Sequence, residues 1–153
     1  NAMDNLRDLG LIDILNKKVI KEKTPILGIC LGMQLMAKRS EEGNYSGLGW
    51  FDAEVVKFEM KDKLKYKIPQ TGWNQIIIEK SSKLMESISN YSEFYFVHSY
   101  YLKCNNKADI LNTTDYESYF TSAIEKDNIF GVQYHPEKSH DVGMKLINNF
   151  IKL

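Results

Sequence analysis

The chain has 153 residues, 43% of them hydrophobic, and its 20 basic side chains balance 20 acidic ones, so its formal net charge is zero. This length and composition predict one globular domain, residues 1–153, with a buried core. Balanced charge argues against nucleic acid or an anionic membrane surface as the main partner, because either would favour a basic face. No apolar run approaches a membrane span and no signal-peptide pattern opens the chain, so we expect a cytoplasmic protein.

The two cysteines, Cys30 and Cys104, show neither the spacing of a metal site nor the pattern of a disulfide framework. This usage fits a reducing compartment. Asn1 and Ala2, which precede Met3, are typical of a tag remnant, and we expect Met3 to be the first encoded residue.

The order of apolar patterns along the chain predicts an α/β fold. Leucines and isoleucines at three- and four-residue steps predict a helix over residues 3–22, weakened in its middle by Gly10. A buried strand over residues 25–29 and a helix over residues 31–39 follow, and then a polar, glycine-containing loop over residues 40–47. Segments rich in β-branched and aromatic residues predict further strands, several of them antiparallel, over residues 51–58, 71–79, 94–97, 100–102, 109–114, 119–125 and 129–134. A lysine-rich turn, a short helix and a closing helix are expected over residues 61–67, 82–88 and 142–151, respectively.

Cys30 lies where the first strand meets the following helix. Gly28 and Gly32 flank it at two residues on either side and allow the tight turn that G-x-S-x-G forms in hydrolases, here with sulfur in place of oxygen. Such a corner directs the side chain into a cleft, and a helix N-terminus favours the thiolate over the thiol. Cys30 taken alone could equally be a small buried hydrophobic residue, so it leaves catalysis and packing both open.

A candidate base follows the last strand. On an extended chain His135 and Glu137 face the same side, and Pro136 keeps the preceding residue extended. A carboxylate beside an imidazole fixes its tautomer and stabilises the imidazolium, while the other ring nitrogen accepts the proton of a nucleophile. We therefore predict a catalytic triad of Cys30, His135 and Glu137.

Two other interpretations of this segment stay open at this point. His135 could be an ordinary histidine at the end of a strand, with Glu137 on the surface. Alternatively, His135, Glu137, His140 and Asp141 could bind a divalent metal, although their irregular spacing and the intervening proline disfavour such a site.

Several ordered motifs resemble a known family. Gly28–Gln34 (Gly-Ile-Cys-Leu-Gly-Met-Gln) with His135–Glu137 (His-Pro-Glu) resembles the class I, triad-type glutamine amidotransferases. Thr71–Asn74 (Thr-Gly-Trp-Asn), Phe96–Tyr101 (Phe-Val-His-Ser-Tyr-Tyr) and His135–Ser139 are similar to motifs of the glutaminase subunits of imidazole glycerol phosphate synthases. The resemblance covers essentially the whole chain and implies a mixed open sheet flanked by helices, with no cofactor and no metal.

The resemblance also implies a reaction. Cys30 attacks the side-chain amide of glutamine, His135 takes the thiol proton and later protonates the departing ammonia, and Glu137 orients His135. Water then hydrolyses the thioester to glutamate. The Leu31 amide is expected to stabilise the oxyanion. The positions that hold glutamine in the family correspond here to Gln34, Glu42, His98, Ser99 and Tyr100.

Family members pass the ammonia to a barrel-fold synthase subunit, which closes the imidazole ring in histidine biosynthesis, so the resemblance implies a heterodimer. A glutaminase docked over a barrel needs a partly apolar face, and Trp73 with Asn74 is our candidate for it. Trp73 could equally belong to the core.

Family members begin with a strand-helix-strand region whose Pro-Gly-x-Gly loop supplies a second oxyanion donor, and this chain starts after the position of that loop. Loss of one oxyanion donor typically lowers the rate by ~10²–10³. We therefore expect the chain to lack the N-terminal strands of the family, to be a weak or inactive glutaminase, and to expose a sheet edge that favours dimerisation.

The accepting pathway has an alternative. Gln70 and Thr71 depart from the His-Met that usually precedes Gly-Trp-Asn, and Gly49–Asp52 and Lys138–His140 are similar to relatives that supply ammonia for amidation of nucleotide sugars or surface polysaccharides. From another class, the chain could be a non-catalytic module that keeps the fold and binds a partner. Reaction of Cys30 with a glutamine-mimicking electrophile would distinguish a glutaminase from such a module.

Overall fold

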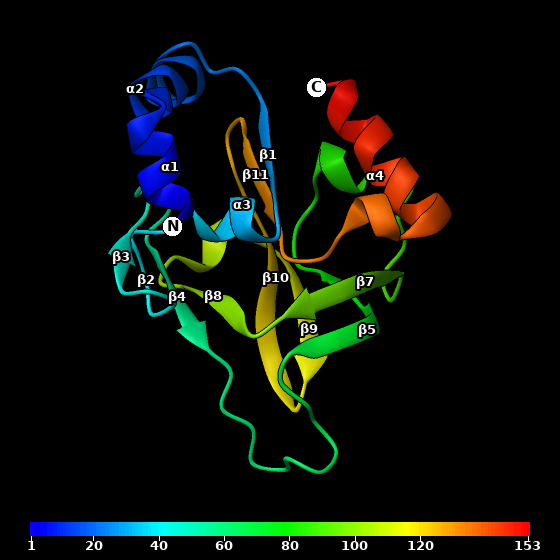
Figure 1. The fold of residues 1–153 in the computed structure, drawn as a ribbon. Coiled ribbons are helices and arrows are strands. Elements are labelled where there is room, and N and C mark those ends of the chain that lie inside the picture. Colours follow the sequence, from blue (N-terminus) through cyan, green and yellow to red (C-terminus); the bar gives the residue numbers. More distant parts are fainter.

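A mixed nine-stranded sheet lies at the centre of the structure, a computed structural model that describes residues 1–153 (Figure 1). Its main path runs in the order β1 (Ile26–Ile29), β11 (Ile129–Val132), β10 (Ser118–Lys126), β8 (Tyr100–Cys104), β4 (Ala53–Lys57), β2 (Arg39–Ser40) and β3 (Tyr45–Ser46). Off this path, β9 (Ile110–Tyr116) pairs with β10 and with β6 (Ile77–Ile78). A separate antiparallel pair is formed by β5 (Gln70–Gln75) and β7 (Glu93–His98).

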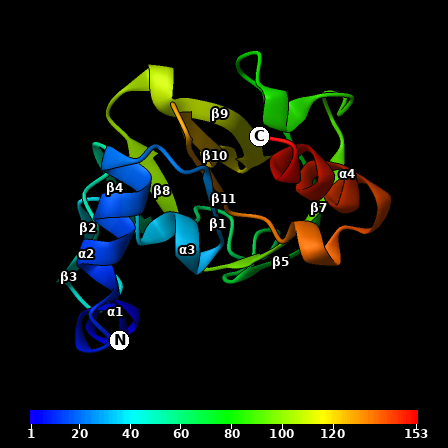
Figure 2. The same cartoon turned by 90° about the horizontal axis from the view of Figure 1, so that it is seen from above.

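Helices cover this sheet on two sides. Figure 2 shows α1 (Ala2–Asp8) and α2 (Leu11–Leu15) on one side of the β1–β11 pair and α4 (His140–Ile151) on the other. A π-helical segment, η1 (Asn16–Lys21), continues α2, and the one-turn helix α3 (Leu31–Gln34) follows β1. Three 3₁₀ turns complete the structure: η2 (Lys83–Met85), η3 (Lys107–Asp109) and η4 (Pro136–Lys138).

The core is divided between the two faces of the sheet. Ile129 belongs to one hydrophobic cluster and its neighbour Phe130 to the other, as expected where successive strand residues point to opposite faces. The larger cluster reaches α4 through Leu146, and the smaller one reaches η1 through Val19 and α3 through Met33. The β1–β11 pair is thus packed from both sides, which fixes the position of the residues that follow these two strands.

Most predicted strands are confirmed, as is the closing helix, but the long N-terminal helix is wrong. Gly10 adopts a left-handed backbone conformation, with φ of 66°, and separates α1 from α2. The predicted strand over residues 71–79 is also divided, because β5 pairs with β7 whereas β6 pairs with β9.

The predicted helix over residues 31–39 ends at Gln34, and its second half is wrong for a tertiary reason. The carbonyl oxygens of residues 35–38 accept hydrogen bonds from backbone N–H groups of residues 47–51 rather than from a next helical turn. The predicted loop over residues 40–47 accordingly contains strands β2, which ends at Ser40, and β3.

β1 pairs with β11 only, so it forms one edge of the sheet, as predicted. None of the helices combines the length and the apolar character needed to cross a membrane.

Candidate active site

Cys30 occupies a strained corner between β1 and α3. Its backbone has φ of 50° and ψ of −106°, a conformation that non-glycine residues rarely adopt, and its N–H donates to the carbonyl of Val132 at 2.8 Å. The turn is tight because a Cβ on Gly28 would lie 2.6 Å from the carbonyl carbon of Gly32. Gly32 itself has open space for a Cβ, so only Gly28 is required by close packing. The predicted tight turn at Cys30 is therefore present. It requires glycine at position 28, in β1, but not at position 32.

The surroundings of the Cys30 sulfur differ from the expectation of a ready thiolate. Burial raises the pKa of the thiol, and N–H groups of Leu31 and Gln133 lower it without cancelling that effect. The carboxylates of Glu137 and Glu42 raise the pKa further. The prediction of a helix-stabilised thiolate is wrong, because α3 is one turn long and desolvation of the charged form outweighs its N–H groups. Cys30 consequently needs a base to become a nucleophile.

His135 leaves the sheet beside Cys30. Strands β1 and β11 run parallel with Ile29 opposite Val132, so the chain emerges from both strands at the same end of the sheet. His135 Nδ1 lies 2.6 Å from Glu137 Oε1, and because an ionised carboxylate can only accept, Nδ1 carries the proton. The other nitrogen, Nε2, is buried and has no hydrogen-bond partner, including Cys30 Sγ. Nε2 therefore has a free lone pair, as a general base requires.

The route by which Glu137 reaches His135 was predicted incorrectly. The chain is extended only up to His135, with φ of −105° and ψ of 92°, and Pro136 begins the 3₁₀ turn η4. The carboxylate thus approaches the ring from a turn rather than from an extended strand. Ser139, fully buried, anchors this turn: its hydroxyl donates to the carbonyl of His135 at 2.6 Å and accepts from the N–H of Tyr95 at 3.0 Å.

A cavity of about 280 Å³ opens beside the sulfur. It gathers Cys30, Leu31 and all five positions predicted to hold glutamine, together with one residue that was not predicted. The lining residues are Cys30, Leu31, Gln34, Glu42, Val97, His98, Ser99 and Tyr100. His135 and Glu137 do not line this cavity.

Gln34 presents one particular atom to this cavity. Its Nε2 donates to the carbonyl of Tyr100 and to Oε1 of Gln133, both at 3.0 Å, which uses both N–H bonds of the amide. Its Oε1 makes no hydrogen bond within the protein, so Gln34 can serve a substrate only as an acceptor.

His98 is held differently from the expectation of a direct substrate contact. Its Nδ1 lies 2.8 Å from the carbonyl oxygen of Tyr100 and its Nε2 lies 2.9 Å from Oε1 of Gln70, so both ring nitrogens are engaged inside the protein. Burial lowers the pKa of His98 to about 4, with a smaller effect of the same sign from His135, so the ring is neutral near pH 7. A neutral ring that donates to a carbonyl through Nδ1 needs a donor at Nε2, so it requires the Gln70 amide turned by 180°, with its N–H₂ group in place of Oε1 toward the ring.

Three residues of the site were missed in the sequence: Val97, Gln70 and Gln133. Gln133 had a usable signal, because it lies two residues before His135 in a segment that continues β11 and so shares its face. The sequence around Gln70 gave no such signal, since its partner, His98, is 28 positions away.

The metal alternative finds no support in the geometry. Among the His, Cys, Asp and Glu side chains, no group of three or more could hold a metal ion. His140, one of the proposed ligands, instead stacks on the Trp73 ring, with centroids 5.1 Å apart and planes 11° apart.

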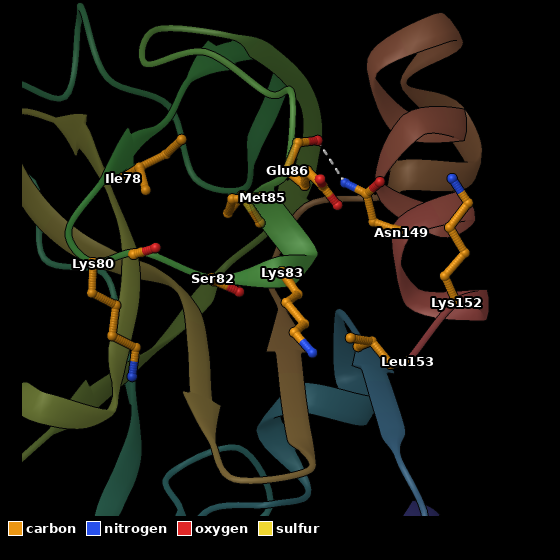
Figure 3. Close-up of a pocket in the computed structure, with 10 residues that line it drawn as sticks. Ile78, Lys80, Ser82, Lys83, Met85, Glu86, Asn149, Lys152 and Leu153 are labelled. Atoms are coloured by element: carbon orange, nitrogen blue, oxygen red, sulfur yellow. Dashed lines mark hydrogen bonds between the residues drawn. The ribbon is translucent and has the colours of Figure 1, made fainter.

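A larger cavity, about 620 Å³, lies between η2 and the end of α4, away from Cys30 (Figure 3). Two of its polar side chains have partners inside the protein: Asn149 Nδ2 donates to the carbonyls of Leu84 and Glu86, and Lys80 Nζ donates to those of Ala108 and Glu125. The predicted site residues Cys30 and Leu31 line the smaller cavity, at the end of β1, and not this one.

A cysteine at a strained strand-to-helix corner and a histidine oriented by a carboxylate at the end of the adjacent strand are what the sequence resemblance implied. A family model for class I glutamine amidotransferases matches residues 10–153. The chain belongs to this family. Its fold is accordingly that of a glutamine amidotransferase, and the enzyme class predicted from the sequence is confirmed.

Curated relatives refine the position of this glutamine amidotransferase within the family. It is 58% identical to imidazole glycerol phosphate synthase subunit HisH 2 of Methanococcus maripaludis, over 99% of this chain and 74% of the relative. It is 45% identical to the protein of the same name in Pseudomonas aeruginosa, with the same coverage, and 43% identical to subunit HisH of Leptospira interrogans, over 100% of this chain and 76% of the relative. The chain thus spans about three quarters of the length of these relatives.

Solved structures agree with the predicted fold class. A glutamine amidotransferase of Thermotoga maritima superposes with a TM-score of 0.61 at 20% identity, over 95% of this chain and 53% of that one. Another glutamine amidotransferase gives a TM-score of 0.69 at 15% identity, over 96% of this chain and 69% of that one. At these identities the likeness confirms the α/β fold alone.

Proposed function

We propose that this amidotransferase hydrolyses glutamine to glutamate and ammonia through a Cys30 thioester and supplies the ammonia to a barrel-fold cyclase subunit in histidine biosynthesis. The observation that carries the chemistry is the parallel β1–β11 pair, which brings Cys30 and His135 out of the sheet at the same end. The pathway is supported by the names of relatives that are 43–58% identical over almost the whole chain. A cytoplasmic location stays a prediction from the sequence.

Glutamine would enter the cavity beside Cys30 with its amide toward the sulfur. Gln34 Oε1 and the exposed carboxylate of Glu42 are acceptors suited to the α-ammonium group of the substrate. The Ser99 hydroxyl makes no hydrogen bond within the protein and can donate to the α-carboxylate. His98 acts through Tyr100 in this assignment, because its own ring nitrogens are occupied.

Acylation begins when His135 Nε2 removes the proton from Cys30 Sγ as the sulfur attacks the side-chain amide carbon of glutamine. The tetrahedral intermediate places negative charge on the former amide oxygen, and the N–H of Leu31, which has no backbone acceptor, can donate to it. The protonated His135 then gives its proton to the amide nitrogen, the C–N bond breaks and ammonia leaves. The Glu137 carboxylate stabilises the imidazolium during both transfers.

Deacylation uses the same groups in the same positions. His135 Nε2 takes a proton from water as the water oxygen attacks the thioester carbon, and the second oxyanion again receives the N–H of Leu31. Collapse of this intermediate breaks the C–S bond, releases glutamate and returns the proton to Cys30.

An exposed aromatic surface beside the site supports docking of a partner. The Trp73 side chain on β5 is 46% exposed, which rules out the core alternative, and it packs on Tyr95 and His140. Asn74, the other predicted docking residue, uses its amide inside the protein, donating to the carbonyl of Asp115 and accepting from the N–H of Gln75. We therefore assign the docking role to Trp73 and its two aromatic neighbours.

Two of the residues that suggested amidation of sugars, Gln70 and His140, have local explanations. Gln70 bonds the buried His98, and His140 stacks on Trp73, so neither contacts the cavity beside Cys30. Histidine biosynthesis is therefore the preferred pathway.

Covalent labelling tests the proposed chemistry. A glutamine analogue carrying an electrophile should modify Cys30 at least tenfold faster than Cys104, whose pKa burial raises to about 12. Excess glutamine should protect Cys30, and Cys104→Ser should leave its labelling unchanged. Equal and slow labelling of both cysteines would instead support a non-catalytic binding module. Glutamate release, measured with a histidine-pathway cyclase and separately with a sugar-amidating synthetase, would then identify the partner.

A further inference from the structure

A chain of buried amides ends at the Cys30 sulfur. Gln133, which is fully buried, accepts a hydrogen bond on Oε1 from Gln34 Nε2 at 3.0 Å, and its own Nε2 donates to Cys30 Sγ at 3.6 Å. The sulfur also lies 4.0 Å from the carbonyl of Val97, a distance at which a thiol can donate. Gln133 therefore contacts the nucleophile directly but does not line the cavity beside it.

The direction of this hydrogen-bond chain is fixed by its far end. Both N–H bonds of Gln34 are directed at oxygen atoms, those of Tyr100 and Gln133, and a carbonyl oxygen can only accept. The oxygen of the Gln133 amide must consequently face Gln34, which leaves its N–H₂ group facing the sulfur. Rotation of the Gln133 amide by 180° would bring two N–H₂ groups together and would leave the sulfur without a donor.

We propose that Gln133 is a positioning residue for the amidotransferase reaction, which holds the Cys30 sulfur in place and stabilises its thiolate through an N–H whose direction Gln34 imposes. This inference deepens the proposed function and rests on Cys30 being its nucleophile. When His135 takes the thiol proton, the contact with the Val97 carbonyl is lost and the N–H of Gln133 becomes a charge-assisted donor to sulfur. The N–H of Gln133 is thus already directed at the sulfur when the thiolate forms.

The remaining charges around the sulfur act against its ionisation. Burial and the carboxylates of Glu137 and Glu42 raise the pKa of Cys30, whereas the N–H groups of Leu31 and Gln133 lower it. Leu31 contributes a backbone N–H, which is also the oxyanion donor in the proposed reaction. Gln133 is therefore the one side chain whose replacement removes a stabilising contact from the thiolate while all backbone groups and carboxylates stay.

The test is the pH dependence of Cys30 alkylation by iodoacetamide, followed by peptide mapping so that Cys104 serves as an internal reference. Gln133→Met keeps the length of the side chain and removes the donor. Gln133→Glu keeps an acceptor for Gln34 but places a charge beside the sulfur. We expect alkylation of Cys30 at pH 8 to fall roughly tenfold or more in Gln133→Met, with a higher pH midpoint, and to fall further in Gln133→Glu.

Two further variants separate positioning from packing. Gln34→Met leaves Gln133 in place but frees its amide to rotate. We therefore expect the pH midpoint of Cys30 alkylation to rise in Gln34→Met, by less than in Gln133→Met. Asn149→Leu removes another buried amide with two hydrogen bonds, remote from Cys30. It should lower the unfolding temperature and leave the pH midpoint of Cys30 alkylation unchanged.

An unchanged Cys30 midpoint in Gln133→Met and Gln34→Met, with lowered unfolding temperatures, would overturn the inference and leave Gln133 as a packing residue. Iodoacetamide is small and neutral and needs no substrate site, so this result does not depend on glutaminase activity. Failure of the glutamine analogue to label wild-type Cys30 would instead count against the proposed function itself.

Discussion

Replacement of His98 by Asn tests the charge state of the buried ring. His98 is 6% exposed and its ring packs among Phe58, Phe96 and Phe120, so desolvation keeps it neutral and lowers its pKa to about 4, against 6.5 for an ordinary histidine. In the unfolded chain the ring takes up a proton below pH 6.5, whereas in the folded protein it does so only near pH 4. The unfolded state therefore binds more protons between these values, and the free energy of unfolding decreases as the pH falls.

The difference between the two pKa values corresponds to about 3 kcal/mol. This stability is fully present above pH 6.5, is lost at up to about 1.4 kcal/mol per pH unit below it, and is gone at pH 4. His98→Asn keeps a donor for the Tyr100 carbonyl and has no titrating ring. We expect the wild-type protein to lose about 3 kcal/mol more than the variant between pH 7.5 and pH 4.

Urea unfolding at a series of pH values measures this difference directly. Asp4 and Asp52, whose pKa values are lowered by ion pairs and hydrogen bonds, also reduce stability in acid, but they are present in both proteins and cancel in the comparison. His140→Asn, at an exposed histidine, is the matched control. A wild-type curve that runs parallel to that of His98→Asn would refute the reasoning, because the ring would then take up its proton at the same pH in the folded and the unfolded protein.

Three further replacements follow from the contacts described above. Gly28→Ala should destabilise the fold by about 1–3 kcal/mol in chemical unfolding, because its Cβ would lie 2.6 Å from backbone, whereas Gly32→Ala meets no atom within 4 Å and should be tolerated. Ser139→Ala should cost about 1–3 kcal/mol, since it leaves the N–H of Tyr95 without its acceptor and removes one of the two hydrogen bonds that the His135 carbonyl accepts; an unchanged unfolding midpoint would contradict this. Trp73→Ala should leave stability nearly unchanged and weaken binding of the cyclase subunit in titration calorimetry, and Tyr119→Ala, at another exposed aromatic residue, should affect neither.

Strands were easier to predict than helices for a reason that particular residues illustrate. The alternation of Ile129 and Phe130 between two faces is a local pattern, and packing on both faces preserves it. The helix after Cys30 was overestimated because the carbonyls of residues 35–38 have competing donors in residues 47–51. The spacing of apolar residues within a segment does not show that backbone N–H groups from another segment will take its carbonyl oxygens.

The placement of Cys30 and His135 at one end of the sheet was predictable from the sequence, whereas the electrostatics around the Cys30 sulfur were not. Cys30 and His135 follow adjacent parallel strands, and a short apolar run before each of them indicates this. The raised pKa of Cys30 results mainly from burial, and the sulfur contacts Val97 and Gln133, which are distant in the sequence, so the local effect of a helix N-terminus gave the wrong sign. Likewise, the contact between His98 and Gln70 could not be predicted, because Gln70 lies on a different strand, 28 positions away.

The carbonyl of Tyr100 explains why motifs that are distant in the sequence belong to one site. Its oxygen accepts from His98 Nδ1 at 2.8 Å and from Gln34 Nε2 at 3.0 Å, so the start of β8, the end of β7 and the end of α3 are tied to a single atom. Because the two donors occupy both lone pairs, the orientations of the two side chains are set before substrate binds. The Tyr100 carbonyl thereby fixes the orientation of the Gln34 amide, including its Oε1. Through Gln34 it also fixes the orientation of the Gln133 amide, whose Nε2 donates to the sulfur. A displacement at any of the three elements must therefore reach both the substrate acceptor and the sulfur, which couples binding to nucleophile geometry.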